Sequence, residues 1–288
     1  MTGWTVLAAD GLVTLQDRGR PGLAHLGVPR AGALDAPAAA LARRLVGGGV
    51  DDAVLEATLA GVALRAGSSR WVAVTGAPCA VAVDGRPVGH GRAVRVPAGS
   101  ELVLGPARAG VRSYLAVGGG WADEPVLGSR STDTLGGVGP PPVRPGRVLP
   151  VGPADPAPPG GDVPGVGGGW PGEPLLRVDP GPRLDRFAAG TLGRLCATAW
   201  SASGDADRVG LRLVGPALER VDDRELPSEG MVAGAVQVPP DGRPVVLLAD
   251  HPTTGGYPVV AVVRAAELAA CAQLRPGDPV RFSRAPRA

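Results

Sequence analysis

The sequence has 288 residues and a formal net charge of +2, with 44% hydrophobic and 19% charged residues, which is typical of a globular protein with a sizeable core. Acidic and basic residues are interspersed, and no basic run alternates with aromatic residues, which argues against a nucleic-acid-binding protein. All 29 basic residues are arginine, which excludes chemistry that needs a lysine, such as a Schiff base or a P-loop.

Glycine and proline dominate the composition, with 46 and 32 residues respectively. They separate short apolar runs, a pattern that predicts many strands joined by turns. Aromatic residues are only 3% of the chain, so valine, leucine and alanine are expected to fill the core. We therefore predict a mainly β protein with a few helices.

In the N-terminal half, apolar runs predict strands over residues 4–9 and 12–16, with a turn at Asp10 and Gly11 between them. After a loop rich in glycine and proline, Asp35 is the predicted N-cap of a helix that continues through Val46. The same reasoning predicts a hairpin turn at Asp84 and further strands over residues 53–58, 71–75, 80–83, 93–96, 101–104 and 111–117.

The second half begins with a low-complexity stretch. Residues 138–174 are rich in proline and glycine and predict a linker or a long surface loop. Structure resumes with a strand at Leu175, and the chain ends with a helix over 264–274 and a strand over 280–282. The resulting domain prediction is an N-terminal β-rich lobe over 1–137 and a C-terminal β-barrel lobe over 175–288.

Three cysteines, Cys79, Cys196 and Cys271, are odd in number and widely spaced, so we expect buried thiols in a reducing cytoplasm and no metal site. The first residues lack the basic start and apolar stretch of a signal peptide, and no apolar run reaches the roughly 20 residues of a membrane span. We therefore expect a cytoplasmic protein.

Two polar segments interrupt the apolar runs of the first half. Residues 17–35 carry several arginines and a histidine, which suit a carboxylate or a phosphate, although a solvated loop with internal Asp–Arg pairs fits equally well. Residues 127–137 place small hydroxyl residues around Arg130 and Asp133, which suits an anion but is also common in turns and caps. Glu56 lies in an otherwise apolar run and is expected to pair with an arginine.

A third polar segment, residues 250–258, joins two apolar runs at 245–249 and 259–263. It is longer than a hairpin turn requires, and functional residues favour such loops. Asp250 and His251 suit a general base and its partner, and Gly255 with Gly256 allows a ligand to approach the backbone closely. The alternative is a turn whose polar residues have no function.

Six motifs, taken together and in order, resemble the biotin-dependent carboxyltransferase / allophanate hydrolase subunit 2 family over residues 6–283. They are TLQDRGRPGLAHLGVPRAGALD, LEATLAG, YLAVGGG, LGSRSTDTLGG, VQVPPDGRPVVLLADHPTTGGYP and QLRPGD. The resemblance implies two cyclophilin-like β-barrel lobes. In size the chain is most similar to the family members that serve as the C subunit of bacterial 5-oxoprolinase.

That resemblance implies a hydrolase component that works with A-like and B-like partner subunits to convert 5-oxoproline to L-glutamate at the expense of ATP. Because the chain has no lysine, we expect the partners to bind most of the ATP. Two alternatives remain open: a biotin-dependent carboxyltransferase component similar to urea carboxylase, which needs a separate biotin carrier, and a non-catalytic protein that binds a kinase inhibitor.

The resemblance also implies which residues form the site. The expected catalytic residues are Asp250, His251 and Tyr257. The expected substrate-binding residues are Arg18, Arg20, His25, Arg30, Ser129, Arg130, Ser131, Thr132, Asp133, Gln237, Thr253, Thr254, Gly255 and Gly256. The chain departs from the family pattern at Pro252, where glutamine is common.

Overall fold

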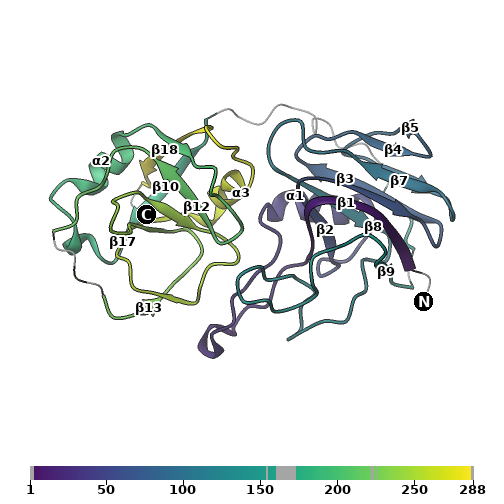
Figure 1. The fold of residues 1–288 in the computed structure, drawn as a ribbon, viewed down its shortest axis with the longest axis horizontal. Helices are drawn as coiled ribbons and strands as arrows, with labels where there is room; N and C mark the ends of the chain where they lie inside the picture. The colour runs from purple at the N-terminus through teal and green to yellow at the C-terminus, as the bar shows by residue number, and fades with distance from the viewer. Residues whose placement is uncertain (1–2, 154, 160–172, 222–223, 225, 287–288) are drawn as a thin grey trace. The chain divides into compact units, whose positions relative to one another are not determined.

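The computed structural model describes residues 3–153, 155–159, 173–221, 224 and 226–286. The chain forms two compact units, each rich in strands (Figure 1). Unit 1 comprises Met1–Arg20, Ala31–Asp133 and Gly137–Trp170, and unit 2 comprises Pro21–Arg30, Thr134–Gly136 and Pro171–Ala288. The mainly β prediction, with few helices, is confirmed.

Unit 1 is built on a nine-stranded sheet among the described residues. Its main path runs β5-β4-β7-β2-β8-β3-β6, while β1 pairs with β2 and with β9. The strands are β1 (Gly3–Gln16), β2 (Val54–Arg65), β3 (Arg70–Gly76), β4 (Val81–Val83), β5 (Arg86–Pro87), β6 (Ala93–Val96), β7 (Glu101–Leu104), β8 (Arg112–Val117) and β9 (Val148–Pro150).

The start of the chain corrects one sequence prediction. Residues 4–16 lie in a single strand, β1, and the predicted turn at Asp10 and Gly11 is wrong. The register against β2 shifts between Asp10 and Leu12, and Gly11 has φ +92°. At this shift Leu59 and Ala60 of β2 lie opposite the single residue Gly11, so a β-bulge in β2 accommodates the site without ending the pairing.

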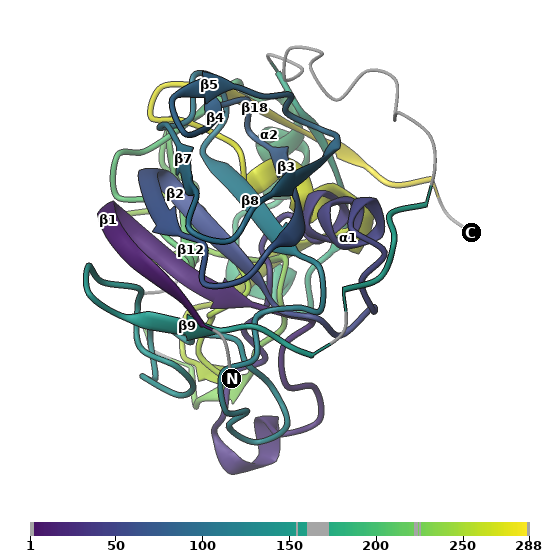
Figure 2. The same ribbon diagram turned by 90° about the vertical axis from the view of Figure 1, so that its right-hand side faces the viewer.

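The helix α1 (Ala36–Leu45) begins where the sequence predicts and ends one residue before the predicted Val46, which is its C-cap. The Asp35 side chain accepts a hydrogen bond from the backbone N–H of Ala38, which makes it the N-cap. Ala39, Ala42 and Leu45 bury one face of the helix against β3 and β8, which lie beside it in Figure 2.

Unit 2 contains a closed barrel with the strand order β10-β17-β14-β15-β12-β11-β18. Parallel pairing of β10 with β18 closes it. The barrel strands are β10 (Leu175–Pro180), β11 (Trp200–Ala202), β12 (Gly210–Val214), β14 (Ala235–Gln237), β15 (Val245–Leu247), β17 (Val259–Val263) and β18 (Pro279–Arg284).

Short elements complete unit 2. Two strands, β13 (Glu229–Gly230) and β16 (Thr254–Gly255), form a separate ladder, and α2 (Thr191–Ala197) precedes β11. The helix expected over 264–274 is shorter, with a 3₁₀ turn η3 (Ala265–Glu267) followed by α3 (Leu268–Cys271). Two further 3₁₀ turns are η1 (Ala24–Leu26) and η2 (Leu184–Arg186).

The stretch expected to be a linker or loop, 138–174, includes structured residues. Val143 is fully buried, and β9 pairs with β1. Residues 160–172, the glycine-rich part of this stretch, lie outside the described residues. Among the described residues, no helix is both long and apolar enough to cross a membrane.

The cores contain mainly valine, leucine and alanine, as the composition predicts, together with a few tryptophans. In unit 1, Trp4 and Trp121 pack edge to face with ring centroids 5.9 Å apart. In unit 2, Trp200 is buried and donates its indole N–H to the carbonyl of Leu195.

The thiols partly follow expectation. Cys79 and Cys271 are buried, but Cys196 is only half-buried, so the prediction of three buried thiols is wrong for that residue. Burial raises the pKa of the Cys271 thiol to about 12 and also raises the pKa of the other two thiols. A raised pKa disfavours the reactive thiolate.

Candidate functional site

In unit 1, the carboxylate of Asp17 joins the first two polar segments. Asp17 lies just after β1 and is 6% exposed. Its Oδ1 accepts from the hydroxyls of Ser129 and Ser131, both at 2.6 Å, and from the N–H of Gly19 at 2.7 Å. Its Oδ2 accepts from the N–H of Arg130 at 2.6 Å. One buried carboxylate therefore fixes residues 129–131 at the end of β1.

Arg20 adds a second link between the same segments. Its Nη2 donates to the carbonyl of Ser131 at 2.5 Å, and its Nε donates to the carbonyl of Val126 at 3.4 Å. Gly139 passes close by with φ +98°, and a Cβ there would lie 2.1 Å from the Ser131 oxygen. Only glycine allows the backbone to approach this closely.

Gln16 and Thr132 continue the contact. The side-chain N–H of Gln16 donates to the Thr132 carbonyl at 3.0 Å, and Thr132 N–H donates to the Leu15 carbonyl at 2.9 Å. Thr132 and Asp133 are both buried. The structure thus gathers Arg20, Ser129, Ser131 and Thr132 near the end of β1, and their expected role in substrate binding stays a prediction.

The hydroxyls of Ser129 and Ser131 nevertheless point to Asp17, because both donate a hydrogen bond to its carboxylate. The Arg130 side chain also bonds within the unit, since its Nε donates to the Asp123 carbonyl at 2.7 Å. These side chains therefore hold the segment 129–131 in place within unit 1.

The other residues of the first segment lie on the surface. The Arg18 side chain is 61% exposed and lies 3.6 Å from Asp51. His25 and Arg30 belong to unit 2 and are exposed, and His25 Nδ1 lies 3.0 Å from the Gly22 carbonyl. Solvent reaches all three side chains, and a substrate role for them stays a prediction.

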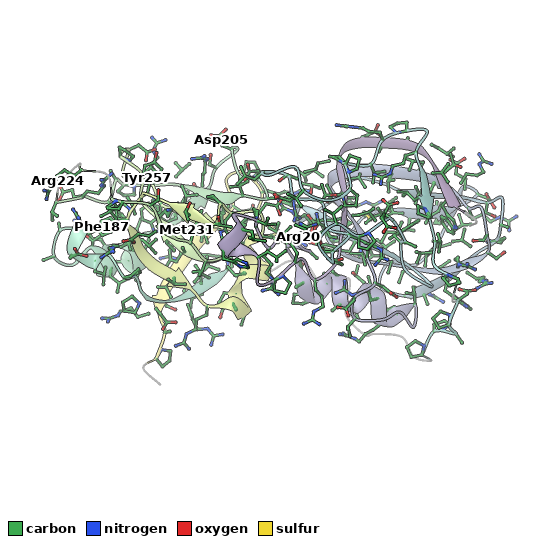
Figure 3. The ribbon with its side chains drawn as sticks, turned by 90° about the horizontal axis from the view of Figure 1, so that it is seen from below. Arg20, Phe187, Asp205, Arg224, Met231 and Tyr257 are labelled. Carbon is green, nitrogen blue, oxygen red and sulfur yellow. The ribbon has the colours of Figure 1, made fainter. Side chains whose placement is uncertain are left out.

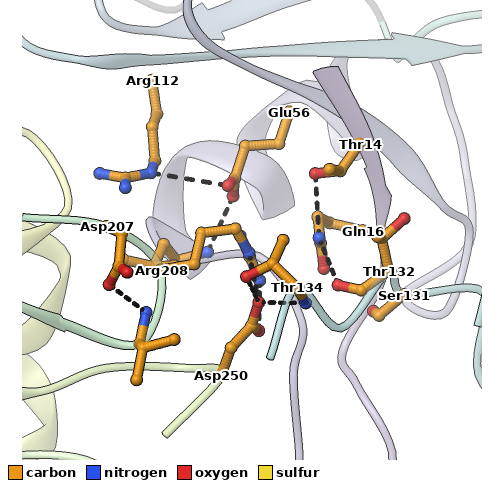
Figure 4. Close-up of polar contacts among 12 residues, drawn as sticks. Thr14, Gln16, Glu56, Arg112, Ser131, Thr132, Thr134, Asp207, Arg208 and Asp250 are labelled. Atoms are coloured by element: carbon orange, nitrogen blue, oxygen red, sulfur yellow. Dashed lines mark hydrogen bonds and ion pairs between the residues drawn. The ribbon is translucent and has the colours of Figure 1, made fainter. Parts of the chain in front are cut away.

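Unit 1 also holds the buried acid noted in the sequence. The pairing expected for Glu56 is confirmed, because its Oε1 lies 3.6 Å from the Arg112 Nε (Figure 4). The Tyr114 hydroxyl donates to Glu56 Oε2 at 2.8 Å and accepts from the N–H of Asp35 at 2.8 Å. Burial and the nearby Glu56 carboxylate raise the pKa of Tyr114 well above its usual value.

In unit 2, Asp250 is fully buried and is held by Arg208 and Thr134 (Figure 4). Arg208 donates from Nε to Oδ2 and from Nη2 to Oδ1, both at 2.9 Å, in a two-pronged pair. Thr134 donates its N–H at 2.9 Å and its hydroxyl at 2.7 Å to Oδ2.

These four bonds decide what Asp250 can do. Three of the bonds reach Oδ2 and one reaches Oδ1, and the carboxylate is fully buried beside the Arg208 guanidinium. A general base needs a free lone pair and access to the proton that it removes. The geometry therefore favours Asp250 as an anchor of the loop over its expected role as a base.

His251, the next residue, has a different environment. It is 8% exposed, and its Nδ1 lies 2.7 Å from the Pro252 carbonyl. A carbonyl only accepts, so Nδ1 carries the proton, and in a neutral ring Nε2 then carries the lone pair. His251 is thus oriented by backbone, with Nε2 suited to accept a proton.

The glycines of the loop are approached by the protein itself. A Cβ on Gly255 would lie 2.9 Å from Gln237 Nε2, and one on Gly256 would lie 3.2 Å from the Leu226 carbonyl. The chain's own atoms therefore approach both glycines closely, and the approach of a ligand to this backbone stays a prediction.

Gln237 lies among these loop residues. It donates from Nε2 to the Tyr257 carbonyl at 3.3 Å and lies 3.2 Å from Met231 Sδ. Figure 3 shows Met231 and Tyr257 on this loop side of unit 2. Tyr257 is 39% exposed and Thr254 is also exposed, so both can reach solvent.

The loop is braced from β13, where Gly255 pairs with Glu229. Arg183 binds the Glu229 carboxylate through both Nε and Nη2, and its hydrogen bond lowers the pKa of Glu229. The Thr253 carbonyl accepts from the Met231 N–H at 2.9 Å. These contacts fix the second half of the loop against the rest of unit 2.

Sequence reasoning missed Arg208, which is 1% exposed and lies 42 positions before its partner. It stands in an ordinary polar stretch before β12, and no local signal distinguishes it from other arginines. Only the rule that a buried acid needs a cationic partner could have prompted a search. Across the described residues, no group of three or more His, Cys, Asp or Glu could hold a metal ion.

Comparisons with known proteins agree with the motifs. The family model described as "Carboxyltransferase domain, subdomain A and B" matches residues 26–284. The C subunit of 5-oxoprolinase from Escherichia coli (strain K12) is 37% identical over 280 residues, which cover 96% of this chain and 89% of that protein.

Two solved structures are also similar. TTHA0988 has a TM-score of 0.89 and 37% identity, and the match covers 98% of this chain and 56% of that chain. The K. lactis urea amidolyase has a TM-score of 0.89 and 28% identity, and the match covers 98% of this chain and 18% of that chain. The chain therefore spans about half of one solved relative and a small part of the other. The resemblance drawn from the six motifs is confirmed.

Proposed function

The chain belongs to the carboxyltransferase-domain family, and from this premise we propose that it serves as the C subunit of a 5-oxoprolinase that converts 5-oxoproline to L-glutamate. One observation carries the proposal: the match to the E. coli C subunit extends over 96% of this chain and 89% of that protein. The match to urea amidolyase covers only 18% of a much longer chain.

Lactam hydrolysis needs two proton movements. A proton leaves the attacking water as it adds to the ring carbonyl, and a proton reaches the ring nitrogen as the C–N bond breaks. In unit 2, His251 is the group whose geometry suits this task, because its Nδ1 is held by the Pro252 carbonyl and its Nε2 keeps a lone pair. We assign His251 this role, with the exposed phenol of Tyr257 as a donor on the same loop.

ATP supplies the driving force for this uphill reaction, and the chain has no lysine with which to build a P-loop. Our proposal therefore gives most of the ATP binding to A-like and B-like partner subunits in a hetero-oligomer. A cytoplasmic location follows from the sequence argument about its three free thiols.

The direct test combines this chain with purified A-like and B-like proteins, 5-oxoproline and ATP, and measures glutamate. Glutamate formation that depends on this chain supports the proposal. If glutamate forms at the same rate without this chain, the proposal is wrong.

The match to urea amidolyase favours carboxyl transfer as a second candidate. That reaction needs a biotin carrier on another protein, because this chain has no lysine to which biotin can attach. Incubation with a biotin carrier that has been carboxylated with radiolabelled bicarbonate separates the two reactions. Label transfer to urea or another acceptor without glutamate formation would favour carboxyl transfer.

A further inference from the structure

Arg208 is tied to residue 250 by both its side chain and its backbone. The guanidinium holds both carboxylate oxygens of Asp250, and the Asp250 N–H donates to the Arg208 carbonyl at 3.0 Å. Next to this contact, the Leu248 N–H donates to the Val209 carbonyl at 2.9 Å. Residues 208–209 therefore extend the β12–β15 pairing up to the start of the loop.

His251 sits at the point where this pairing ends. Its N–H donates to the Leu248 carbonyl at 3.2 Å, so residues 248–251 form a tight turn. The direction of the imidazole depends on that turn and on the bond from Nδ1 to the Pro252 carbonyl. Residue 250 lies within this turn, so a change in its backbone dihedral angles would move the peptide that precedes His251.

We propose that Arg208 is a positioning residue that acts through Asp250 to hold the His251 ring with Nδ1 on the Pro252 carbonyl and Nε2 oriented for proton transfer. The inference rests on the proposed role of His251 and adds a residue that no sequence motif indicates. Arg208 needs no contact with substrate.

The contact with Asp250 requires the planar guanidinium group of arginine, which binds both carboxylate oxygens. Two parallel N–H groups fix the plane of the Asp250 carboxylate, and that plane allows Thr134 to add two more donors on Oδ2. A lysine would keep the charge, but it is a point charge that leaves the carboxylate free to rotate. Arg208→Lys therefore separates the geometry of the pair from its charge.

The experiment uses the complete three-subunit complex and compares Arg208→Lys with Arg264→Lys. Arg264 is a matched control because it makes a two-pronged pair with Asp179 in the same unit, at 3.1 and 3.2 Å, on an exposed surface. We expect Arg208→Lys to lower kcat about tenfold or more while KM stays within about twofold. Arg264→Lys should leave both parameters unchanged.

A spectroscopic readout tests positioning without relying on turnover. The chain has only three histidines, so imidazole ¹⁵N signals can be assigned with His25→Gln and His90→Gln. The wild-type His251 signal should show the tautomer protonated at Nδ1, and Arg208→Lys should shift it toward a mixture. An unchanged tautomer together with an unchanged kcat in Arg208→Lys would overturn the inference.

A second variant separates positioning from stability. The double variant Arg208→Met with Asp250→Leu removes the buried charges together, an exchange that is often neutral or stabilising. If it folds with wild-type thermal stability and loses turnover, positioning is supported; if it keeps full turnover, positioning is refuted. If the wild-type complex makes no glutamate, the proposed function fails, and the tautomer measurement still decides the role of Arg208.

Discussion

Asp17→Asn tests whether the buried carboxylate of unit 1 organises the segment 129–131. In the wild type, Asp17 accepts four hydrogen bonds at 2.6 to 2.7 Å, two from serine hydroxyls and two from backbone N–H groups. Asparagine has one oxygen and one NH₂ group at the same positions. Its best orientation keeps the oxygen on the Oδ1 side, toward Ser129 and Ser131, and turns the NH₂ group toward the Arg130 N–H.

The cost follows from the contacts that change. Placing a donor against the Arg130 N–H loses one charge-assisted bond and leaves that N–H without an acceptor, which costs about 2 to 3 kcal/mol. The other three bonds lose their charge assistance, which costs about 0.5 kcal/mol each because charged acceptors bind roughly twice as strongly. We therefore expect Asp17→Asn to lower the free energy of unfolding by about 4 kcal/mol.

Urea unfolding followed by tryptophan fluorescence measures this loss. Asp84→Asn is the matched control, since Asp84 makes the same type of bond, to the Glu101 N–H at 2.8 Å, on an exposed hairpin of the same unit. Asp84 has φ +47°, a conformation that asparagine tolerates well, and its side chain is exposed, so the control should lose much less stability than Asp17→Asn. Equal losses in the two variants would refute the organising role of Asp17.

Three further predictions concern other buried groups. Tyr114→Phe removes a hydroxyl that donates to Glu56 and accepts from a backbone N–H at the start of α1, so urea unfolding should show a loss of about 2 to 3 kcal/mol; a loss below about 1 kcal/mol would contradict this. Burial lowers the pKa of His90, so the folded state binds a proton at His90 less readily than the unfolded chain does. The free energy of unfolding should therefore fall as pH drops below about 6.5, by at most about 1.4 kcal/mol per pH unit. His90→Gln should flatten this part of the pH profile of thermal unfolding. Gly256→Ala brings a Cβ to 3.2 Å from the backbone carbonyl of Leu226 and should lower the free energy of unfolding by about 1 kcal/mol. Unchanged thermal unfolding would show that the loop shifts to accommodate the methyl group.

Local signals account for what the sequence predicts well. The N-cap at Asp35 and the strands β6 and β7 depend on residues within a few positions of one another, and the structure reproduces them. The Asp84–Gly85 turn also joins β4 and β5 as expected. The failure at Gly11 has the opposite cause: pairing with β2 along the whole strand overrides a local turn signal.

The candidate site is harder to predict because polar residue types do not reveal their partners. Ser129 and Ser131 suit an anion site by composition, but both hydroxyls donate hydrogen bonds to an acid that lies 112 and 114 positions away. Arg208 is hidden for the same reason, since its partner Asp250 is 42 positions away. The motifs identify where the polar groups lie, and only the fold shows which of them are already satisfied.

Internal hydrogen bonds and burial give a physical way to rank the acid–base candidates of each unit. Asp17 and Asp250 each accept four bonds within their own unit and are 6% and 0% exposed, so both carboxylates are committed to internal partners and hardly accessible to a substrate proton. In the loop of unit 2 this leaves His251, which has one nitrogen fixed by a carbonyl and one that carries a lone pair. The two residues predict different pH profiles of turnover in the variants. If one limb of the profile disappears in His251→Asn but persists in Asp250→Asn, the imidazole is the acid–base group. The reverse result would assign the acid–base role to the Asp250 carboxylate.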